Sequence, residues 1–368
     1  MTDRLGPRAL NRALLARQML LDRSATPVED ALEALVGVQA QAPDAPYVGL
    51  WSRLAGFHPD DLGDALVERR AVRTPLMRAT LHLVTAPDAL ALRPVVQPGL
   101  ARSFAGSPFA GLLAGVDLDA LHAAARDLLD ERPRTHPDLA RLLGERWPGH
   151  DANALAYAVT YLLPLVQVTP RAVWGSTGPA AWACTGTWLA VPGSPAGGPT
   201  IDDLVLRYLA AFGPASVRDV QTWSGLSRLR EVADRLRPRL RRFRDGGGTE
   251  LLDLPDAARP APDVPAPPRF LPEYDNVLLS HADRTRINPD RRPVPLPPGQ
   301  GAARGTLLVD GLFAGTWQVG GRDPAAALTV RPFGPLDGAG ASAVADEAAR
   351  LLAFLAPGAT ALRIVPPG

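Results

Sequence analysis

Apolar residues recur at helical spacing through the N-terminal part of the chain, which predicts a run of helices. Leucine and methionine side chains of the first one fall on a single face. The pattern then changes to the alternation of two short strands, joined near residues 76–78. Helices followed by a two-stranded wing are typical of a winged helix-turn-helix. The predicted helices are 8–22, 27 to about 36, 47–55 and 59–70, and the strand pair occupies 71–86.

The same order of elements recurs twice, without a repeat of individual residues. In the second copy Thr135 is the expected cap of its helix, with Pro137 in the first turn. The third copy ends in a hairpin with a glycine-rich tip. The second copy comprises helices at 117–130, 135–146 and 151–163 and strand material at 165–175 and 182–191. The third comprises helices at 199–213, 215–225 and 226–240 and the hairpin 240–255.

Strand-like segments dominate the C-terminal part, which two proline-rich segments punctuate. Several strands at short spacing with glycine turns predict a small β-barrel or curled sheet. The expected fold class is therefore α+β, with three tandem winged helix-turn-helix modules arranged around a small β-barrel. The proline-rich segments are 255–269 and 292–299; the strands 269–281, 305–319, 328–333 and 361–365; the helix 341–356. The expected domains are 1–100, 101–198 and 199–256 for the winged helices, and 257–368 for the barrel and C-terminal elements.

Composition narrows the functional classes. Hydrophobic residues make up 46% and charged residues 21% of the 368-residue chain, without an apolar run long enough to cross a membrane. We expect a cytoplasmic protein, because the N-terminus lacks the pattern of a signal peptide. The single cysteine, Cys184, excludes an internal disulfide. The six histidines show no metal-binding spacing, and no motif for ATP or NAD is present, so neither a metal nor a cofactor is expected.

Every basic side chain is an arginine, because the sequence contains no lysine. Codon bias of a GC-rich genome is the simplest cause, but the chemistry follows regardless: no lysine can form a Schiff base. Residues 228–244 hold eight arginines against Glu231 and Asp234. A solvated surface helix would explain this cluster, and so would DNA binding by the last helix of a helix-turn-helix and its wing. Arg228, Arg230 and Arg237 are the candidate contacts.

Gln39 and Gln41 lie just past an amphipathic helix, in the segment VGVQAQAPDAPYVGLW (36–51). In extended backbone, side chains two residues apart point the same way, so both amides could face one cavity. Glutamines at a helix end are usually solvated, and the spacing alone therefore does not identify a site.

Three segments give the chain a resemblance to a known family: QAQAP, the wing MRATLHLV, and FLPEYDNVLLSHADRTRI (270–287). Together they resemble the AlkZ and YcaQ DNA glycosylases, over nearly the whole chain. The resemblance implies three winged helices around a β-barrel, with a concave DNA-binding face, and a monomer. Gln39 and Gln41 match the Gln-x-Gln pattern of the AlkZ-like branch, where YcaQ-like members have Gln-x-Asp. That branch is associated with self-resistance to DNA-alkylating antibiotics such as azinomycin.

The resemblance makes Gln39 and Gln41 the candidate catalytic residues of a glycosylase that needs no metal. An N7-alkylated purine in double-stranded DNA, including a bulky adduct or an interstrand crosslink, is already cationic and leaves without protonation. Such an enzyme needs only a held water and stabilisation of an oxocarbenium-like sugar. A glutamine carbonyl can accept a hydrogen bond from that water but is no strong base. Without lysine, the enzyme is expected to be monofunctional, leaving the abasic strand intact.

Further DNA contacts are expected from His281, Arg284 and Arg286, on a hairpin reaching into the DNA. Alternatively, Asp283 and Arg284 pair internally and this segment braces the barrel. Arg78 and His82, near the first wing, are expected to line the active-site groove, and His82 to face away from the core between Leu81 and Leu83. Two other functions remain open at this point: a non-catalytic winged-helix transcription regulator and a drug-sequestering protein.

Overall fold

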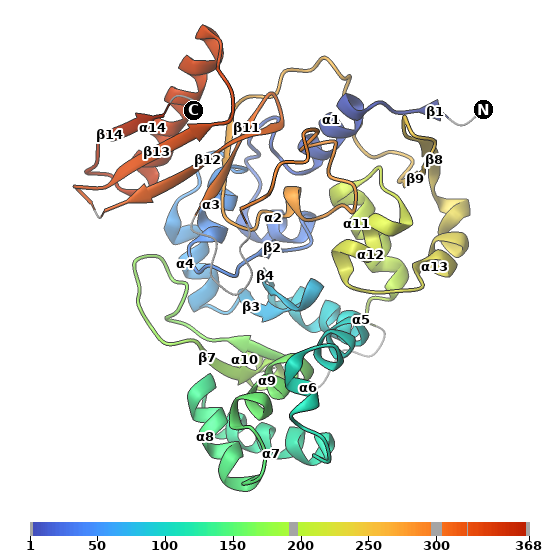
Figure 1. The fold of residues 1–368 in the computed structure, drawn as a ribbon, viewed down its shortest axis with the longest axis vertical. Coiled ribbons are helices and arrows are strands. Elements are labelled where there is room, and N and C mark those ends of the chain that lie inside the picture. The colour runs from blue at the N-terminus through green and yellow to red at the C-terminus, as the bar shows by residue number, and fades with distance from the viewer. Residues whose placement is uncertain (1–2, 191–197, 296–303, 322, 366–368) are drawn as a thin grey trace.

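The computed structural model describes residues 3–190, 198–295, 304–321 and 323–365. Figure 1 shows three groups of helices: the second (green) forms one end of the molecule, and the C-terminal strands (red) lie towards the other end. Within these ranges the strands form three sheets, of three, five and six strands. No helix of the described part is long and apolar enough to cross a membrane.

The first group, residues 3–105, confirms the predicted helices and strand pair. β3 and β4 are antiparallel, and the short β2 pairs with the other edge of β4. The first helix was predicted to extend to residue 22 but ends at Arg17. Two residues later, Met19 adopts a left-handed backbone conformation (φ 55°), which stops the helix. The elements are β1 (Asp3–Arg4), α1 (Pro7–Arg17), α2 (Val28–Ala34), β2 (Val38–Gln39), α3 (Ala45–Trp51), α4 (Pro59–Val67), β3 (Ala71–Pro75), the 3-10 turn Met77–Ala79 and β4 (Leu81–Thr85).

A long helix, α5 (Ala86–Ala105), follows β4 and was not predicted. It contains Pro94 and Pro98, and proline inside a helix removes a backbone hydrogen bond and clashes with the preceding turn. Both prolines are exposed, whereas Leu92, Val96 and Leu100 are buried in the central core. Burial of these three side chains outweighs the cost of the prolines, and α5 runs across residue 100, the expected domain boundary.

The second group, residues 108–190, has its own core between α7, α8 and α9. The predicted cap is confirmed: the Thr135 hydroxyl accepts from the Asp138 amide, and the Asp138 carboxylate accepts in return. The expectation of a strand through 182–191 is wrong beyond Cys184, because 185–189 is helical. The elements are α6 (Pro108–Gly111), α7 (Leu118–Glu131), β5 (Arg134–Thr135), α8 (His136–Arg146), α9 (Ala152–Leu162), β6 (Leu165–Gln167), β7 (Ala181–Cys184) and α10 (Thr185–Leu189). Pairing of β6 with β3 joins both groups in one six-stranded sheet, ordered β2-β4-β3-β6-β7-β5.

The third group, residues 200–253, follows its predicted elements closely. The carboxylates of Asp203 and Asp219 complete capping boxes at the starts of its first two helices. Tyr208, Phe212 and Trp223 pack in one core with leucines of α1, so the first and third groups are not separate units. The elements are α11 (Ile201–Phe212), α12 (Val217–Ser224), α13 (Leu229–Leu236), the 3-10 turn Arg237–Arg239, and the hairpin β8 (Arg241–Arg244) and β9 (Glu250–Asp253), to which β1 adds in parallel.

The C-terminal strands form an open sheet, so the predicted β-barrel is wrong. The strand order is β10-β11-β12-β13-β14, which leaves β10 and β14 as edges. β13 and β14 are parallel, and the crossover between them is α14, whose buried side chains pack in one core with residues of β10 to β13. A helix covering the sheet buries its apolar side without closure. The elements are β10 (Arg269–Leu271), the 3-10 turn Asn276–Leu278, β11 (Gly305–Val309), β12 (Leu312–Gly320), β13 (Ala327–Pro332), α14 (Gly338–Leu355) and β14 (Ala361–Ile364). The proline-rich segment predicted at 292–299 lies partly outside the described residues.

Candidate active site and nucleic-acid interface

A tight turn between α2 and β2 delivers Gln39 to the edge of β4. Val36 and Gly37 both have positive φ, 54° and 81°. A Cβ at residue 37 would lie 2.5 Å from a methyl group of Val84 and 3.0 Å from the Leu83 carbonyl oxygen. Only glycine fits this approach. Gln39 then pairs with His82 across the β2–β4 ladder, and its side chain is buried (6% exposed).

Arg78 binds the carbonyl oxygen of the Gln39 side chain. Its Nη2 donates to Gln39 Oε1 at 2.8 Å and to Asn276 Oδ1 at 3.3 Å, and its Nη1 donates to the Trp223 carbonyl at 2.9 Å. Asn276 in turn donates through Nδ2 to the Gly37 carbonyl, 3.1 Å away. Burial, helped by the charge of Arg284, lowers the pKa of Arg78 to about 10, so it remains a cation at neutral pH.

Gln41 lies on the exposed side of the same segment. Its Oε1 accepts from the Leu81 backbone amide at 3.3 Å. Gln39 lines a small cavity of about 10 Å³ together with Gln18, Arg53 and Asn276, and Gln41 does not line it. The structure therefore places the two amides against β4 but not in one shared cavity.

His82 is fully buried, which corrects the expectation that it faces away from the core. Its Nδ1–H donates to the Thr80 carbonyl, 3.0 Å away, which leaves Nε2 as an acceptor with no partner among the described residues. Burial and the neighbouring Arg78 lower its pKa to about 3. The ring is therefore neutral at physiological pH and offers no charge to a phosphate.

A buried ion pair, Arg53–Asp275, lies next to Gln39 and Asn276. The Asp275 carboxylate accepts two hydrogen bonds of 2.9 Å from the Arg53 guanidinium, and both side chains are less than 5% exposed. Arg53 Nη2 also donates to Gln18 Oε1 at 3.3 Å. Asp275 precedes Asn276 directly in the chain. The Arg53–Asp275 pair therefore fixes the position of Asn276, which contacts Arg78 and the Gly37 carbonyl.

Two carboxyl groups with raised pKa values lie close to the glutamine segment. Partial burial raises the pKa of Asp44, three residues after Gln41, against the opposing charges of Arg73 and Arg171. Burial also raises the pKa of Glu273, and the charge of Asp44 adds to that shift. Glu273 belongs to the LPEYDN segment (271–276), which therefore supplies an amide to the Arg78 site and a carboxyl group that interacts with Asp44.

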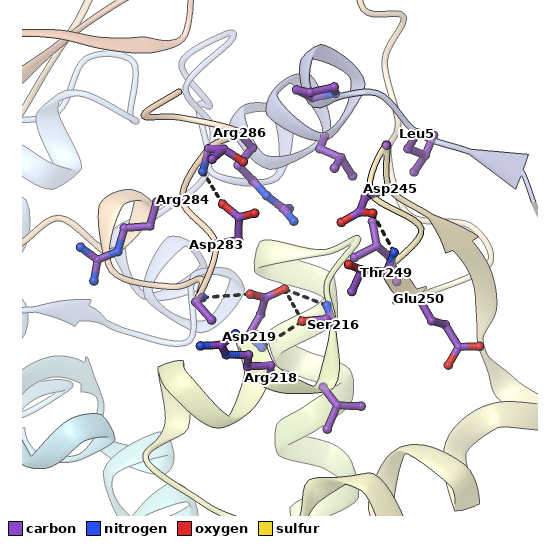
Figure 2. Close-up of a pocket in the computed structure, with 18 of the residues that line it drawn as sticks. Leu5, Ser216, Arg218, Asp219, Asp245, Thr249, Glu250, Asp283, Arg284 and Arg286 are labelled. Atoms are coloured by element: carbon purple, nitrogen blue, oxygen red, sulfur yellow. Dashed lines mark hydrogen bonds between the residues drawn. The ribbon is translucent and has the colours of Figure 1, made fainter. Parts of the chain in front are cut away.

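A groove of about 1110 Å³ lies between α12, α13, the β8–β9 tip and residues 282–292 (Figure 2). Arg284 and Glu250 stand at opposite sides of it. Arg230 and Arg237 line it as well, but Arg237 is paired with Asp234 and Glu250. Four exposed arginines of the lining have no ion-pair partner in the described part of the chain; we call them the groove arginines, and they are Arg218, Arg230, Arg284 and Arg291. Arg228, an exposed cap of α13, is not among the lining residues.

Residues 281–286 form a loop rather than the predicted hairpin, and this loop is fastened to the third group. His281 Nε2 donates to the Phe212 carbonyl (3.1 Å), and Arg286 Nη1 to the Pro214 carbonyl (2.8 Å). The Asp219 carboxylate accepts from the Ala282 amide. His281 and Arg286 are both buried, and burial lowers the pKa of His281 to about 3. His281 and Arg286 therefore fasten the loop to the third group, whereas Arg284 projects outward (Figure 2). The alternative of an Asp283–Arg284 pair that braces a barrel is not found either, because no such pair forms among the described residues and the sheet is open.

Asn276, Arg53, Asp275 and two groove arginines, Arg218 and Arg291, were not singled out from the sequence. The LPEYDN segment was noticed as a motif, and its Asp275–Asn276 pair was the available signal. Nothing in the sequence indicated Arg218 or Arg291. No cluster of three or more His, Cys, Asp or Glu side chains that could hold a metal occurs in the described ranges.

The chain is similar to known proteins in both sequence and fold. The family model described as "DNA glycosylase AlkZ-like" matches residues 32–354, which include β2, the β3–β4 strand pair and the LPEYDN segment. The chain belongs to the AlkZ-like DNA glycosylase family. The solved structure of the Streptomyces sahachiroi DNA glycosylase AlkZ superimposes with a TM-score of 0.73 and 21% sequence identity, covering 98% of this chain and 100% of that one. A search of curated proteins found no match.

Family membership makes this chain a DNA glycosylase, a hydrolase of DNA repair. The resemblance noted in the sequence is thereby confirmed, and a regulator without catalytic function is the weaker interpretation. The structural similarity, at this level of identity, shows that the fold is shared.

Proposed function

We propose that the chain is a monofunctional glycosylase that hydrolyses the N-glycosidic bond of cationic N7-alkylated purines in double-stranded DNA. Its substrates would include bulky adducts and interstrand crosslinks, and its role would be self-resistance to a DNA-alkylating antibiotic. The observation that carries the proposal is the pair of neutral amides, Gln39 and Gln41, at the Gln-x-Gln position of an AlkZ-like chain without lysine. We also propose that the three groups are winged helices and that the protein acts as a monomer in the cytoplasm.

The amides suit a base that leaves without acid catalysis. A carbonyl oxygen has two lone pairs, so Gln39 Oε1 can accept from Arg78 and still accept from a water. Gln41 Oε1 has the same capacity beside the Leu81 amide.

The choice of substrate follows from what the amides cannot do. Neither amide is an acid strong enough to protonate a neutral leaving base, so uracil and 8-oxoguanine are expected to stay in DNA while N7-methylguanine is released. The measurement is base release by the purified protein from matched duplexes that carry each lesion, followed by a check for strand cleavage. Robust release of uracil would overturn the proposal. Cleavage of the abasic strand by β-elimination, surviving a blocked N-terminus, would refute the monofunctional claim.

The groove arginines are the proposed contacts to DNA phosphates. Removal of one arginine that binds a phosphate is expected to reduce the slope of log affinity against log salt by about 0.9. Changing Arg218, Arg230, Arg284 and Arg291 to glutamine together should therefore flatten that slope by roughly 3 to 4 and weaken binding at least tenfold at physiological salt. Fluorescence anisotropy with undamaged duplex at several salt concentrations measures both quantities. The matched control changes four exposed arginines of the second group, Arg126, Arg132, Arg141 and Arg146; an equal loss in both quadruple variants would show that only net charge matters.

A further inference from the structure

Arg78 occupies an unusual position for a residue first expected to contact DNA. It sits in the turn between β3 and β4 with a left-handed backbone (φ 58°), as does Ala79 (φ 55°). A non-glycine residue in this region costs about 1 kcal/mol or more, so the surrounding contacts must hold it there. The Gly225 turn packs against it: a Cβ on Gly225 would lie 3.4 Å from the Arg78 amide nitrogen.

Both terminal nitrogens of Arg78 are committed inside the protein. Nη1 donates to the Trp223 carbonyl, and Nη2 donates to Gln39 Oε1 and Asn276 Oδ1. These acceptors belong to three segments that are distant in sequence: α12, β2 and the LPEYDN segment. Three of the five N–H donors of the guanidinium are thus engaged inside the protein, whereas Arg284 is exposed and has no ion-pair partner in the described part of the chain.

The identity of the donor fixes the orientation of the glutamine. The two ends of an amide side chain are interchangeable in shape but opposite in hydrogen bonding. A guanidinium has only donors, so only the carbonyl end of Gln39 can face Arg78. That leaves the second lone pair of Oε1 in a fixed direction and turns the Nε2 amino group to the other side. Asn276 donates to the Gly37 carbonyl through Nδ2, which leaves its Oδ1 as the second acceptor for Arg78 Nη2.

We propose that Arg78 is a positioning residue for catalysis, which orients the Gln39 amide, and not a contact to DNA. This inference rests on the proposed function, since it assigns Arg78 a part in base release through Gln39. It replaces the expectation that Arg78 lines the active-site groove as a contact to DNA. The fixed amide pre-organises the acceptor for the water, so no reorientation is needed during the reaction.

The test compares rate constants for N7-methylguanine release under single turnover in four proteins: wild type, Arg78→Ala, Gln39→Ala and the double variant. Arg78→Ala should lose about 10- to 100-fold, the range typical of removing a group that orients a catalytic side chain. In the Gln39→Ala background the same change should matter less than about threefold, because the group that Arg78 orients is already gone. Affinity for undamaged duplex and its salt slope should be unchanged by Arg78→Ala.

Chemical rescue separates positioning from a purely structural part. Guanidinium ion at low millimolar concentration, against matched sodium chloride, should restore a measurable share of the rate of Arg78→Ala. The matched control is Arg93→Ala, because Arg93 is also buried and donates to a glutamine, Gln97, and to two backbone carbonyls. Arg93→Ala should lower the unfolding temperature without lowering the rate constant measured well below that temperature.

Other results would count against the positioning role of Arg78 or against the proposed function. Independent, multiplicative losses in the double variant, or a reduced salt slope in Arg78→Ala, would overturn the positioning role while leaving the glycosylase intact. If the wild type releases none of the cationic bases, the proposed function fails first, and the inference falls with it. Should Arg78→Ala not fold, the same cycle is run with Arg78→Lys, which keeps the charge but cannot reach all three acceptors at once.

Discussion

Replacing Gln39 and Gln41 together with alanine is expected to lower the rate constant of N7-methylguanine release by about 10³-fold or more. Removal of one pre-organised hydrogen-bonding group from an active site typically costs about 10²- to 10³-fold, and here both are lost. Affinity for undamaged duplex should stay within about twofold, since neutral side chains that release no counterions are removed. The measurements are single-turnover base release and anisotropy on the same preparations.

The matched control for that experiment is Gln97→Ala. Gln97 also accepts a hydrogen bond from an arginine, Arg93, but lies on α5. Its loss should leave the rate constant unchanged. The single variants add resolution: Gln39 is buried and tied to Arg78, whereas Gln41 is exposed and tied only to the Leu81 amide, so Gln39→Ala should be the more severe. A double variant that still released the base at the wild-type rate would remove both amides from the mechanism.

Much of the fold could be predicted because its signals are local. The start of α8 follows from the Thr135–Asp138 capping box, and the start of α12 from Ser216 and Asp219. The helix α5 could not be predicted in the same way. Pro94 and Pro98 argue against a helix locally, and only the burial of the opposite face against the shared core reverses that preference.

The error over the barrel has a different physical origin. Strand count and spacing do not say whether a sheet closes, because closure depends on which strands become neighbours. Here β13 and β14 are parallel, so they need a crossover, and α14 supplies it. Once α14 covers the sheet, closure offers no further burial. The alternation of Leu81, His82 and Leu83 also gave a wrong prediction, that His82 faces away from the core. Both sides of β4 are covered by protein, and His82 is buried.

Only part of the candidate site could likewise be predicted from the sequence. The Gln-x-Gln segment was found through resemblance to a family, and its extended backbone at Gln39 followed from local sequence. The contacts of Arg78 with Trp223 and Asn276 join residues 145 and 198 positions apart. No spacing rule connects such distant segments, and the role of Arg78 depended on knowing them. Exposure, which separates Arg284 from the buried Arg286, is likewise a tertiary property.

Breaking the Arg53–Asp275 pair is expected to cause a large loss of stability. Asp275→Ala removes the only carboxylate paired with Arg53 among the described residues and leaves a buried guanidinium whose Nε already lacks a partner. Removal of one partner from a buried ion pair typically costs about 3–5 kcal/mol. The free energy of unfolding, from urea titration followed by tryptophan fluorescence, measures this loss. The control is Arg141→Ala, which breaks an exposed pair with Glu145 and should cost less than about 1 kcal/mol.

A double variant, Arg53→Met with Asp275→Leu, should recover part of the stability lost in Asp275→Ala, because apolar groups of similar size avoid an unpaired buried charge. It should not recover base release. Asn276 would lose the fixed neighbour that holds it against Arg78 and the Gly37 carbonyl, and the Gln39 amide would lose its support in turn. If the double variant regained both stability and rate, the ion pair would matter only for folding, and the chain of contacts from Arg53 to Gln39 would carry no part of the chemistry.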